Sequence, residues 1–162
     1  MRKRLFEQIA HRILSGATGG EVVYVGLWNN NIDYLSGGAV FDTPAVFVEF
    51  EDIEWRKAQN GARTAEVGVR LHLVTKAEHF DGYEDGRRDS ALFYLELLDT
   101  LVAAMHGFGG EGFASFQHTT SYTNHDHAEL IDSVERFVTR VVDTAAMNGE
   151  VSCVPIETLR VR

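Results

Sequence analysis

The feature that most constrains the fold is the regular alternation of apolar and polar residues over 63–77, RTAEVGVRLHLVTKA. One side of an extended chain would carry only apolar side chains here, namely Val67, Val69, Leu71 and Leu73. The opposite side would carry the polar side chains Glu66, Arg70, His72 and Lys76. Because successive side chains of a strand point to opposite faces of a sheet, this pattern predicts a strand with one buried and one wet face.

The segment before it, PAVFVEFEDIEW (44–55), also alternates and begins with a proline, which the first position of a strand tolerates. The intervening NGAR (60–63) is typical of a turn. The two segments together predict a central β-hairpin.

A long amphipathic helix is predicted over 89–106, with Asp89 as its N-cap and Gly107 at the C′ position. We expect the apolar face of the 63–77 strand to pack against this helix. The apolar stripe of the helix consists of Leu92, Leu95, Leu98, Leu101, Val102 and Met105.

A second amphipathic helix is predicted over 2–15 and ends at Gly16. Its apolar stripe consists of Leu5, Phe6, Ile9, Ile13 and Leu14. Further extended segments are predicted at 21–28, 112–122 and 152–161, and a polar loop at 78–88.

The segment 129–146, ELIDSVERFVTRVVDTAA, fits two structures. Leu130, Val134, Phe137, Val138 and Val141 follow helical spacing, but the high content of β-branched residues favours a strand. The residue pattern alone leaves both open. The whole chain, 1–162, reads as one α+β domain with a mostly antiparallel sheet flanked by helices.

Composition excludes several classes of protein. A net charge of −9 argues against nucleic-acid binding and against anionic membranes. No apolar run approaches the ~18 residues of a membrane span, and the N-terminal apolar stretch is broken by charged residues, unlike a signal peptide. The single cysteine, Cys153, makes no intrachain disulfide and reads as a small apolar residue. We expect a cytoplasmic protein.

Candidate binding motifs are weak. Gly107, Gly109 and Gly112 spell G-x-G-x-x-G, but they leave a helix and enter a strand, the reverse of a dinucleotide site. His118, His125 and His127 are the only metal-like cluster, and they lack the spacing typical of zinc sites. We therefore predict no tightly bound metal or nucleotide, with these three histidines as weak metal candidates.

An acidic run is a candidate for acid–base chemistry, and a group of aromatic residues is a candidate for a subunit interface. The acidic residues of 49–54 can do acid–base chemistry when one is desolvated, but alternation places Glu49 and Glu51 on the wet face of a strand. No G-x-S-x-G motif supports a hydrolase, and no catalytic residue is predicted. Trp28, Phe47 and Trp55 provide more aromatic surface than one face of a small sheet needs, so we expect them at a subunit interface.

The order of these segments resembles the tail terminator, or tail completion, proteins of long-tailed phages and prophages. The resemblance rests on the strand PAVFVEF, the alternating strand AEVGVRLHLV, the helix ALFYLELLDTL and the late segment FVTRVVD, and it spans about residues 2–146. Neither the loop 78–88 nor the tail after residue 146 matches the family.

The resemblance implies a mixed sheet flanked by helices, and it implies that 129–146 is a strand. It also implies a virion structural protein with no enzymatic activity. Such a protein forms a ring, usually hexameric, at the head-proximal end of the tail tube, and contacts the tail tube protein and the head–tail connector. It would be found in the bacterial host cytoplasm and then in the virion tail. The alternative, from another class, is a small enzyme or ligand- or metal-binding α+β domain that uses the His125 and His127 region.

Overall fold

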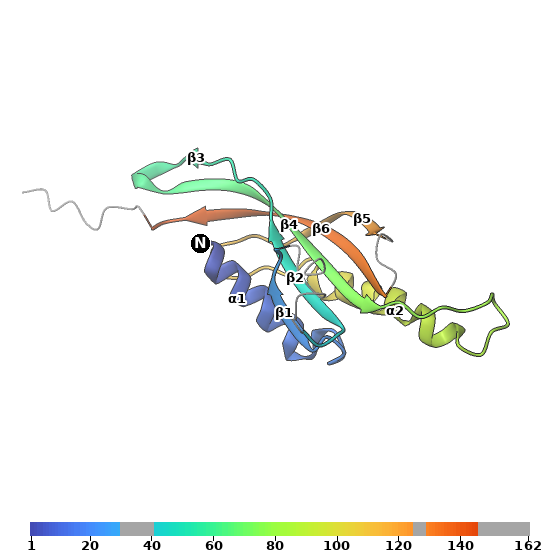
Figure 1. Ribbon diagram of the computed structural model, residues 1–162. Coiled ribbons are helices and arrows are strands. Elements are labelled where there is room, and N and C mark those ends of the chain that lie inside the picture. Colours follow the sequence, from blue (N-terminus) through green and yellow to red (C-terminus); the bar gives the residue numbers. More distant parts are fainter. Residues whose placement is uncertain (30–40, 125–128, 146–162) are drawn as a thin grey trace, which may run out of the picture.

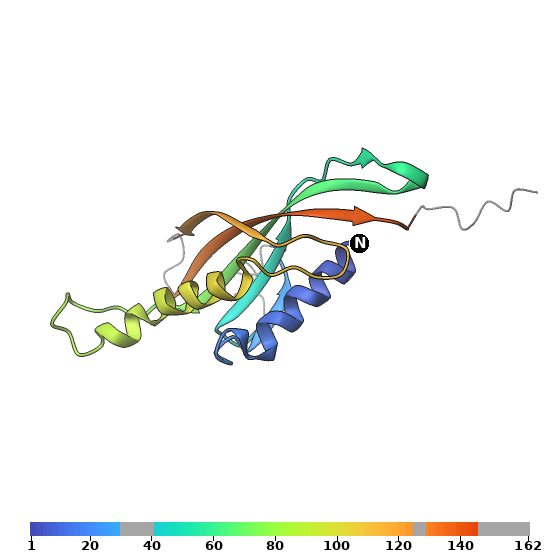
Figure 2. The same cartoon turned by 180° about the vertical axis from the view of Figure 1, so that it is seen from behind.

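The computed structural model describes residues 1–29, 41–124 and 129–145. Its centre is a twisted six-stranded sheet with the strand order β1-β2-β4-β6-β5, to which β3 adds beside β4 (Figure 1). The described helices, α1 and α2, contribute their buried side chains to one core cluster with the strands, and Figure 2 shows both on the same face of the sheet. The α+β fold with a mostly antiparallel sheet is therefore confirmed; only β1 and β2 run parallel.

The predicted hairpin forms the middle of this sheet. β2 (Ala45–Phe50) pairs antiparallel with β4 (Arg63–Lys76), Ala45 facing Val74 and Phe50 facing Val69. The first strand is shorter than predicted, because the chain leaves the sheet after Phe50. It resumes pairing at β3 (Arg56–Lys57), and the 3₁₀ turn η3 (Gln59–Gly61) then reverses the chain.

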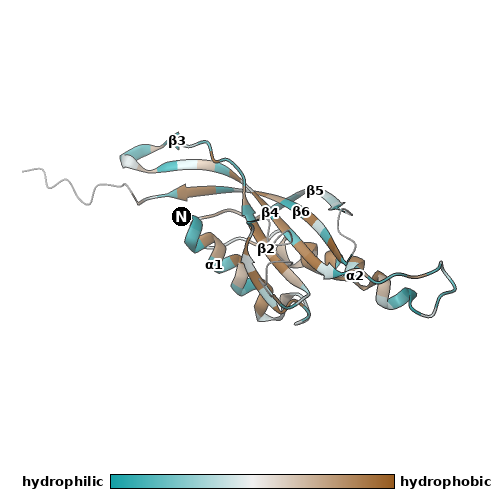
Figure 3. Cartoon of the chain, in the orientation of Figure 1, coloured by the Kyte–Doolittle hydropathy of each residue, from teal (hydrophilic) through white to brown (hydrophobic). Residues whose placement is uncertain are grey.

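The segment with two possible structures is a strand. β6 (Leu130–Asp143) pairs antiparallel with β4 along its whole length, from Leu130 opposite Lys76 to Asp143 opposite Arg63. Both strands continue past the helices and form, with β3, an arm that projects from the body of the molecule (Figure 1). In Figure 3 the arm carries more hydrophilic residues than the centre of the sheet does.

The two edge strands differ from their predicted bounds. β1 is confined to Tyr24–Leu27, and β5 covers Gln117–Asn124 instead of 112–122. The β5 strand starts later because Phe113 and Phe116 turn into the core, where they are 8% and 0% exposed. The predicted strand 152–161 lies outside the described residues.

Helix α1 (Arg2–Arg12) continues into a π-helical turn, η1 (Ile13–Ala17), in which Gly16 has a φ of 92°. This left-handed conformation ends the helix at the predicted glycine. Leu5, Ile9 and Ile13 are buried as predicted, but Leu14 is 51% exposed, because it lies about half a turn around the helix from Leu5.

Helix α2 (Arg88–Met105) ends as predicted, with Gly107 at a φ of 79°. Its predicted start at Asp89 is wrong: the N-cap residue is Arg87, and Asp89 pairs with Arg88 instead. Leu95 was expected in the stripe and is 44% exposed. Leu97 is buried in its place, because it lies about 40° around the helix from the fully buried Leu101, whereas Leu95 lies about 120° from it.

The main core lies between the helices and the sheet. It contains the four apolar residues of β4 that were predicted to face α2, each at most 1% exposed, together with residues of both helices. A smaller core of Ala45, Phe47 and Val74 lies on the opposite face of the sheet, where Trp28, Phe41 and Leu130 pack against it. The sheet therefore buries apolar side chains on both faces.

Candidate functional site

The sheet face opposite the helices, here called the outer face, carries a connected series of charged side chains. Strand β2 contributes one residue, strands β4 and β6 contribute two each, and the residue directly after β2 adds one more. The members are Glu49, Glu51, Arg70, His72, Asp132 and Arg136. They reach the same face because they occupy alternate positions on neighbouring strands.

Glu51 forms the strongest contacts of the series. Both its carboxylate oxygens accept hydrogen bonds from Arg136, each at 2.7 Å, and Arg70 Nε lies 2.9 Å from Oε1. Two-point pairing of this kind fixes orientation as well as charge. The hydrogen bond from Arg136 holds the pKa of Glu51 below its ordinary value of 4.5, with the charges of Arg136 and Arg70 acting in the same direction and partial burial acting against them.

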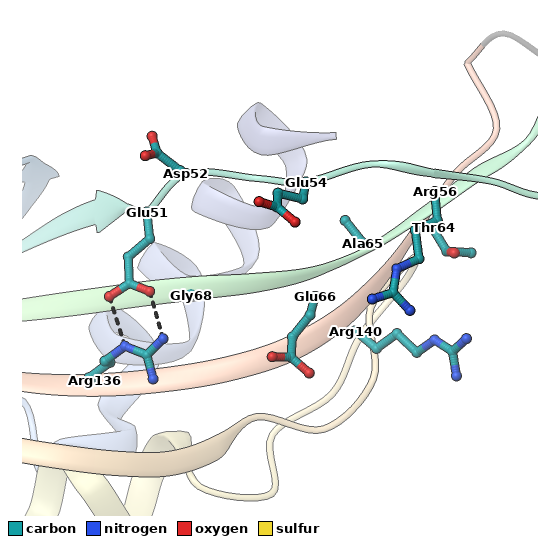
Figure 4. A pocket seen from close by; sticks show the side chains of 10 residues that line it. All are labelled: Glu51, Asp52, Glu54, Arg56, Thr64, Ala65, Glu66, Gly68, Arg136 and Arg140. Atoms are coloured by element: carbon teal, nitrogen blue, oxygen red, sulfur yellow. Dashed lines mark hydrogen bonds and ion pairs between the residues drawn. The ribbon is translucent and has the colours of Figure 1, made fainter.

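Gly68 makes the Glu51–Arg136 pair possible. A Cβ atom at position 68 would lie 2.6 Å from Cδ of Glu51 and would collide with Oε2. Glycine inside a strand often marks such a close approach. Here the side chain of Glu51 crosses the backbone of β4 to reach Arg136 on β6 (Figure 4).

His72 continues the series toward β1. Its Nδ1 lies 3.2 Å from Asp132 Oδ1 and its Nε2 lies 3.2 Å from Glu49 Oε2. Both contacts are hydrogen bonds only when both ring nitrogens carry a proton. The prediction that His72 lies on a wet face is wrong: the residue is 4% exposed, because Trp28 covers its ring at a centroid distance of 3.7 Å.

A cavity of about 510 Å³ opens beside Glu51, where the outer face leads into the arm (Figure 4). A second hollow of about 570 Å³ adjoins it, with Glu51, Asp52 and Arg136 lining both. Figure 4 shows Glu66, Arg56 and Arg140 on the arm side of the first cavity. Arg56 and Arg140 have no ion pair among the residues that the structure describes.

The chemistry of this region favours recognition over catalysis. Glu51 is held as a carboxylate by two arginines, and so is poorly suited to donate a proton. Acidic and basic groups alternate over a short distance, which suits a partner surface with a matching charge pattern. Arginine is also enriched at protein interfaces.

His118 lies in a separate polar cluster on the helix side of the sheet. Its Nε2 is 2.6 Å from Glu135 Oε2 and 3.2 Å from the hydroxyl of Ser121, which also donates to Glu135. In a Ser–His–acid relay the carboxylate and the hydroxyl meet opposite ring nitrogens. Here both meet the same nitrogen, so this arrangement is not such a relay.

Metal and thiol candidates can be located only in part. Among residues 1–29, 41–124 and 129–145, no group of three or more His, Cys, Asp or Glu side chains is arranged to hold a metal ion. His125, His127 and Cys153 lie outside the described residues. The weak metal candidates His118, His125 and His127 therefore stay a prediction.

The three aromatic residues expected at an interface have different surroundings. Phe47 is 1% exposed, because Tyr24, Trp28 and Phe41 pack around its ring within the same chain. The ring of Phe47 is thus enclosed by side chains of its own chain, and the expected interface stays a prediction. Trp28 and Trp55 are half-buried, and Trp55 packs under the guanidinium of Arg63 at 4.2 Å.

Sequence reasoning identified Glu49 and Glu51 but missed their partners Arg136, Asp132 and Gly68. A glycine inside the alternating strand 63–77 was the one available signal for a close approach. The partners on β6 could not be assigned while 129–146 had two possible structures, because a helix would not place residues 132 and 136 on this face.

In the part of the chain that the structure describes, no helix is long and apolar enough to cross a membrane. Comparison with models of known protein families finds no match, and no curated protein is significantly similar to the sequence.

Proposed function

We propose that this chain is a virion structural subunit of the tail terminator type. In this proposal it assembles into a ring, a hexamer, at the head-proximal end of a tail tube. The ring contacts the tail tube protein on one side and the head–tail connector on the other. The subunit acts through protein–protein contacts and not through catalysis.

The observation that carries the proposal is the β6 strand. The resemblance implied a strand over 129–146 against the helical spacing of its apolar residues, and residues 130–143 do form one. A helix at this place would have counted directly against the proposed family. The strand supports the order of elements on which the resemblance rests.

The sheet also offers two different edges for assembly. Among the described residues, β1 pairs only with β2, and β5 pairs only with β6. The two edge strands run in opposite directions, so β5 of one copy has the right polarity for antiparallel pairing with β1 of the next. Such contacts are head-to-tail and close into a ring when the rotation between subunits allows it.

Exposed apolar side chains lie at the β1 edge. Val23 and Leu27 are 54% and 56% exposed, and Tyr24 is 41% exposed. Exposed apolar groups at a sheet edge favour association. The net charge of −9 agrees with a ring that lets DNA pass, because phosphates are repelled by an acidic surface.

The test is assembly in solution. Purified protein, alone at high concentration and with the cognate tail tube protein, is examined by native mass spectrometry and by electron microscopy of negatively stained samples. We expect a ring of six copies, and little affinity for duplex DNA at low salt. The proposal would be overturned if the protein stayed monomeric, did not bind the tail tube protein and bound DNA tightly.

A matched pair of variants tests the edge. Leu27→Lys places a charge at the β1 edge and should prevent ring formation. Leu95→Lys changes a residue of α2 that is 44% exposed and should leave assembly unchanged. Equal assembly of both variants would contradict the role of the β1 edge.

A further inference from the structure

A cavity of about 420 Å³ lies at the end of β4, beside the first half of α2 and the residues that lead into β2. Its volume falls within the range of small-molecule sites, roughly 300–1,000 Å³. The lining includes Thr75, Pro44, Phe93 and Tyr94. It is separate from the charged series on the outer face.

Thr75 has an unusual environment in this cavity. The residue is 5% exposed, and its hydroxyl is the one buried side-chain polar group without a hydrogen-bond partner among the described residues. By contrast, the buried hydroxyls of Thr18 and Thr139 donate to the carbonyls of Ile13 and Ala114, at 3.1 and 2.6 Å. Burying a hydroxyl without a partner is unfavourable, so nearly all such groups are paired.

Other hydrogen-bond donors beside the cavity are also unused. Lys76 lines it and has no ion pair among the described residues. Helix α2 begins here without a side-chain cap, and the first turn of a helix carries unpaired N–H groups and partial positive charge.

The two acidic residues of the lining already have partners. Asp89 accepts a hydrogen bond from Arg88, and Glu78 accepts one from the hydroxyl of Ser90. The unused donors of the lining include the hydroxyl of Thr75 and the side chain of Lys76. Glu78 also shows that a carboxylate fits beside the first turn of α2.

We propose that this cavity binds a carboxylate carried on an apolar group. The carboxylate would accept hydrogen bonds from Thr75 and the first turn of α2 and would pair with Lys76. The apolar group would pack against Pro44, Phe93 and Tyr94. Glu78, whose carboxylate accepts a hydrogen bond from Ser90, adds a negative charge beside this site.

The probes are 3-phenylpropionate and its neutral amide, with binding measured by isothermal titration calorimetry and by NMR. We expect the acid to bind about tenfold more tightly than the amide, since charge-assisted hydrogen bonds are the stronger ones. A second acid, acetyl-Gly-Phe with a free C-terminus, distinguishes the source of the ligand. Its binding points to a protein C-terminus, whereas binding of the small acid alone points to a free carboxylic acid.

Three variants test the roles of the lining residues. Thr75→Val should weaken the acid about fivefold or more, whereas Thr75→Ser keeps the hydroxyl and should bind as the wild type does. Lys76→Gln should weaken it as well, and Lys57→Gln in the arm should not. Glu78→Gln should strengthen it, because the negative charge beside the site is removed, whereas Glu84→Gln should have no such effect.

Equal affinity for the acid and the amide would overturn the proposal, as would unchanged binding in both Thr75→Val and Lys76→Gln. The proposal would also be overturned if neither acid bound at millimolar concentration and about tenfold excess over the protein, provided that circular dichroism shows all variants to be folded. These measurements do not depend on ring formation, so they leave the assembly proposal to its own test.

Discussion

Trp28 lies flat on His72, with ring centroids 3.7 Å apart and 7° between the ring planes. The indole belongs to the residue directly after the edge strand β1, and the imidazole comes from β4 at the centre of the sheet. Beneath the indole, Asp132 and Glu49 face the two ring nitrogens. Stacked aromatic rings attract one another beyond the area that they bury. One contact thus joins the edge of the sheet to the charged series at its centre.

Replacing His72 by Phe keeps a ring under Trp28 but leaves the carboxylate of Asp132 without its partner. The Asp132 side chain is 5% exposed. Leaving a buried hydrogen-bonding group without its partner costs about 1–3 kcal/mol, so we expect a loss in that range. Urea unfolding, followed by circular dichroism, gives the free energy. Adding Asp132→Asn to His72→Phe should recover part of the loss; if the double variant is no more stable than His72→Phe, the pair is not the cause.

Glu51→Gln tests the carboxylate at the centre of the charged series. Its hydrogen bonds to Arg136 and Arg70 involve charged groups, and each bond of this kind stabilises a protein by at most about 1.5–3 kcal/mol. We therefore expect the substitution to lower the free energy of unfolding by about 1–3 kcal/mol at pH 7. Chemical denaturation gives the value. Glu96→Gln on the exposed surface of α2 is the control and should change stability by less than about 0.5 kcal/mol.

The contact between Glu51 and Arg136 predicts that the stability of the fold depends on pH. The pKa of Glu51 is lower in the folded protein than its ordinary value of 4.5, because Arg136 hydrogen bonds to the carboxylate. The stabilisation is therefore complete above the unfolded pKa and is lost as the pH falls through the folded pKa. We expect the stability difference between wild type and Glu51→Gln to be constant near neutral pH and to shrink below pH 4.5. A difference that stays constant down to acid unfolding would contradict this assignment.

Gly68→Ala should move Glu51 away from Arg136, because the added methyl group occupies the path of the Glu51 side chain. Overpacking of this kind costs about 1–3 kcal/mol. In a Glu51→Ala background the obstacle is gone, and alanine is favoured over glycine in a strand by roughly 0.5–1 kcal/mol. The effect of Gly68→Ala should therefore change sign, measured by thermal and urea unfolding. Gly86→Ala, with open space around its Cβ position, is the control for the substitution itself.

Arg63 should hold the arm together. Its guanidinium donates two hydrogen bonds to Asp143, at 3.0 and 2.8 Å, and covers the ring of Trp55. Lysine cannot reproduce the planar fork, so Arg63→Lys should loosen the contact between β4 and β6 in the arm. Hydrogen exchange measured by mass spectrometry should increase over 56–65 and remain unchanged over 67–74. Increased exchange in both segments would mean that the substitution weakens the whole sheet.

Strand β4 and the elements around it show which parts of the fold could be predicted from the sequence. Alternation over 63–77 was enough to predict the strand and its buried face, because burial of Val67 or Leu71 depends only on the two-residue period of a strand. The C-terminus of α2 at Gly107 was equally predictable, because left-handed backbone at this position favours glycine. By contrast, Leu14 and Leu95 fit their apolar stripes and are still exposed. Both lie at or beyond the flank of the buried face, and only the packing of the helix on the sheet decides where that face is centred.

The sequence by itself determined the α+β class, the central hairpin, the buried face of β4 and the C-terminal ends of both helices, since each depends on residues close together in the chain. Only the tertiary structure decided the surroundings of His72, whose polar side chain fits a wet face as well as a buried hydrogen-bonded site. Its partners Trp28 and Asp132 lie 44 positions before it and 60 positions after it in the chain. Whether a polar residue is solvated or enclosed depends on which distant strands become neighbours, and pairing across a sheet leaves little trace in a local pattern.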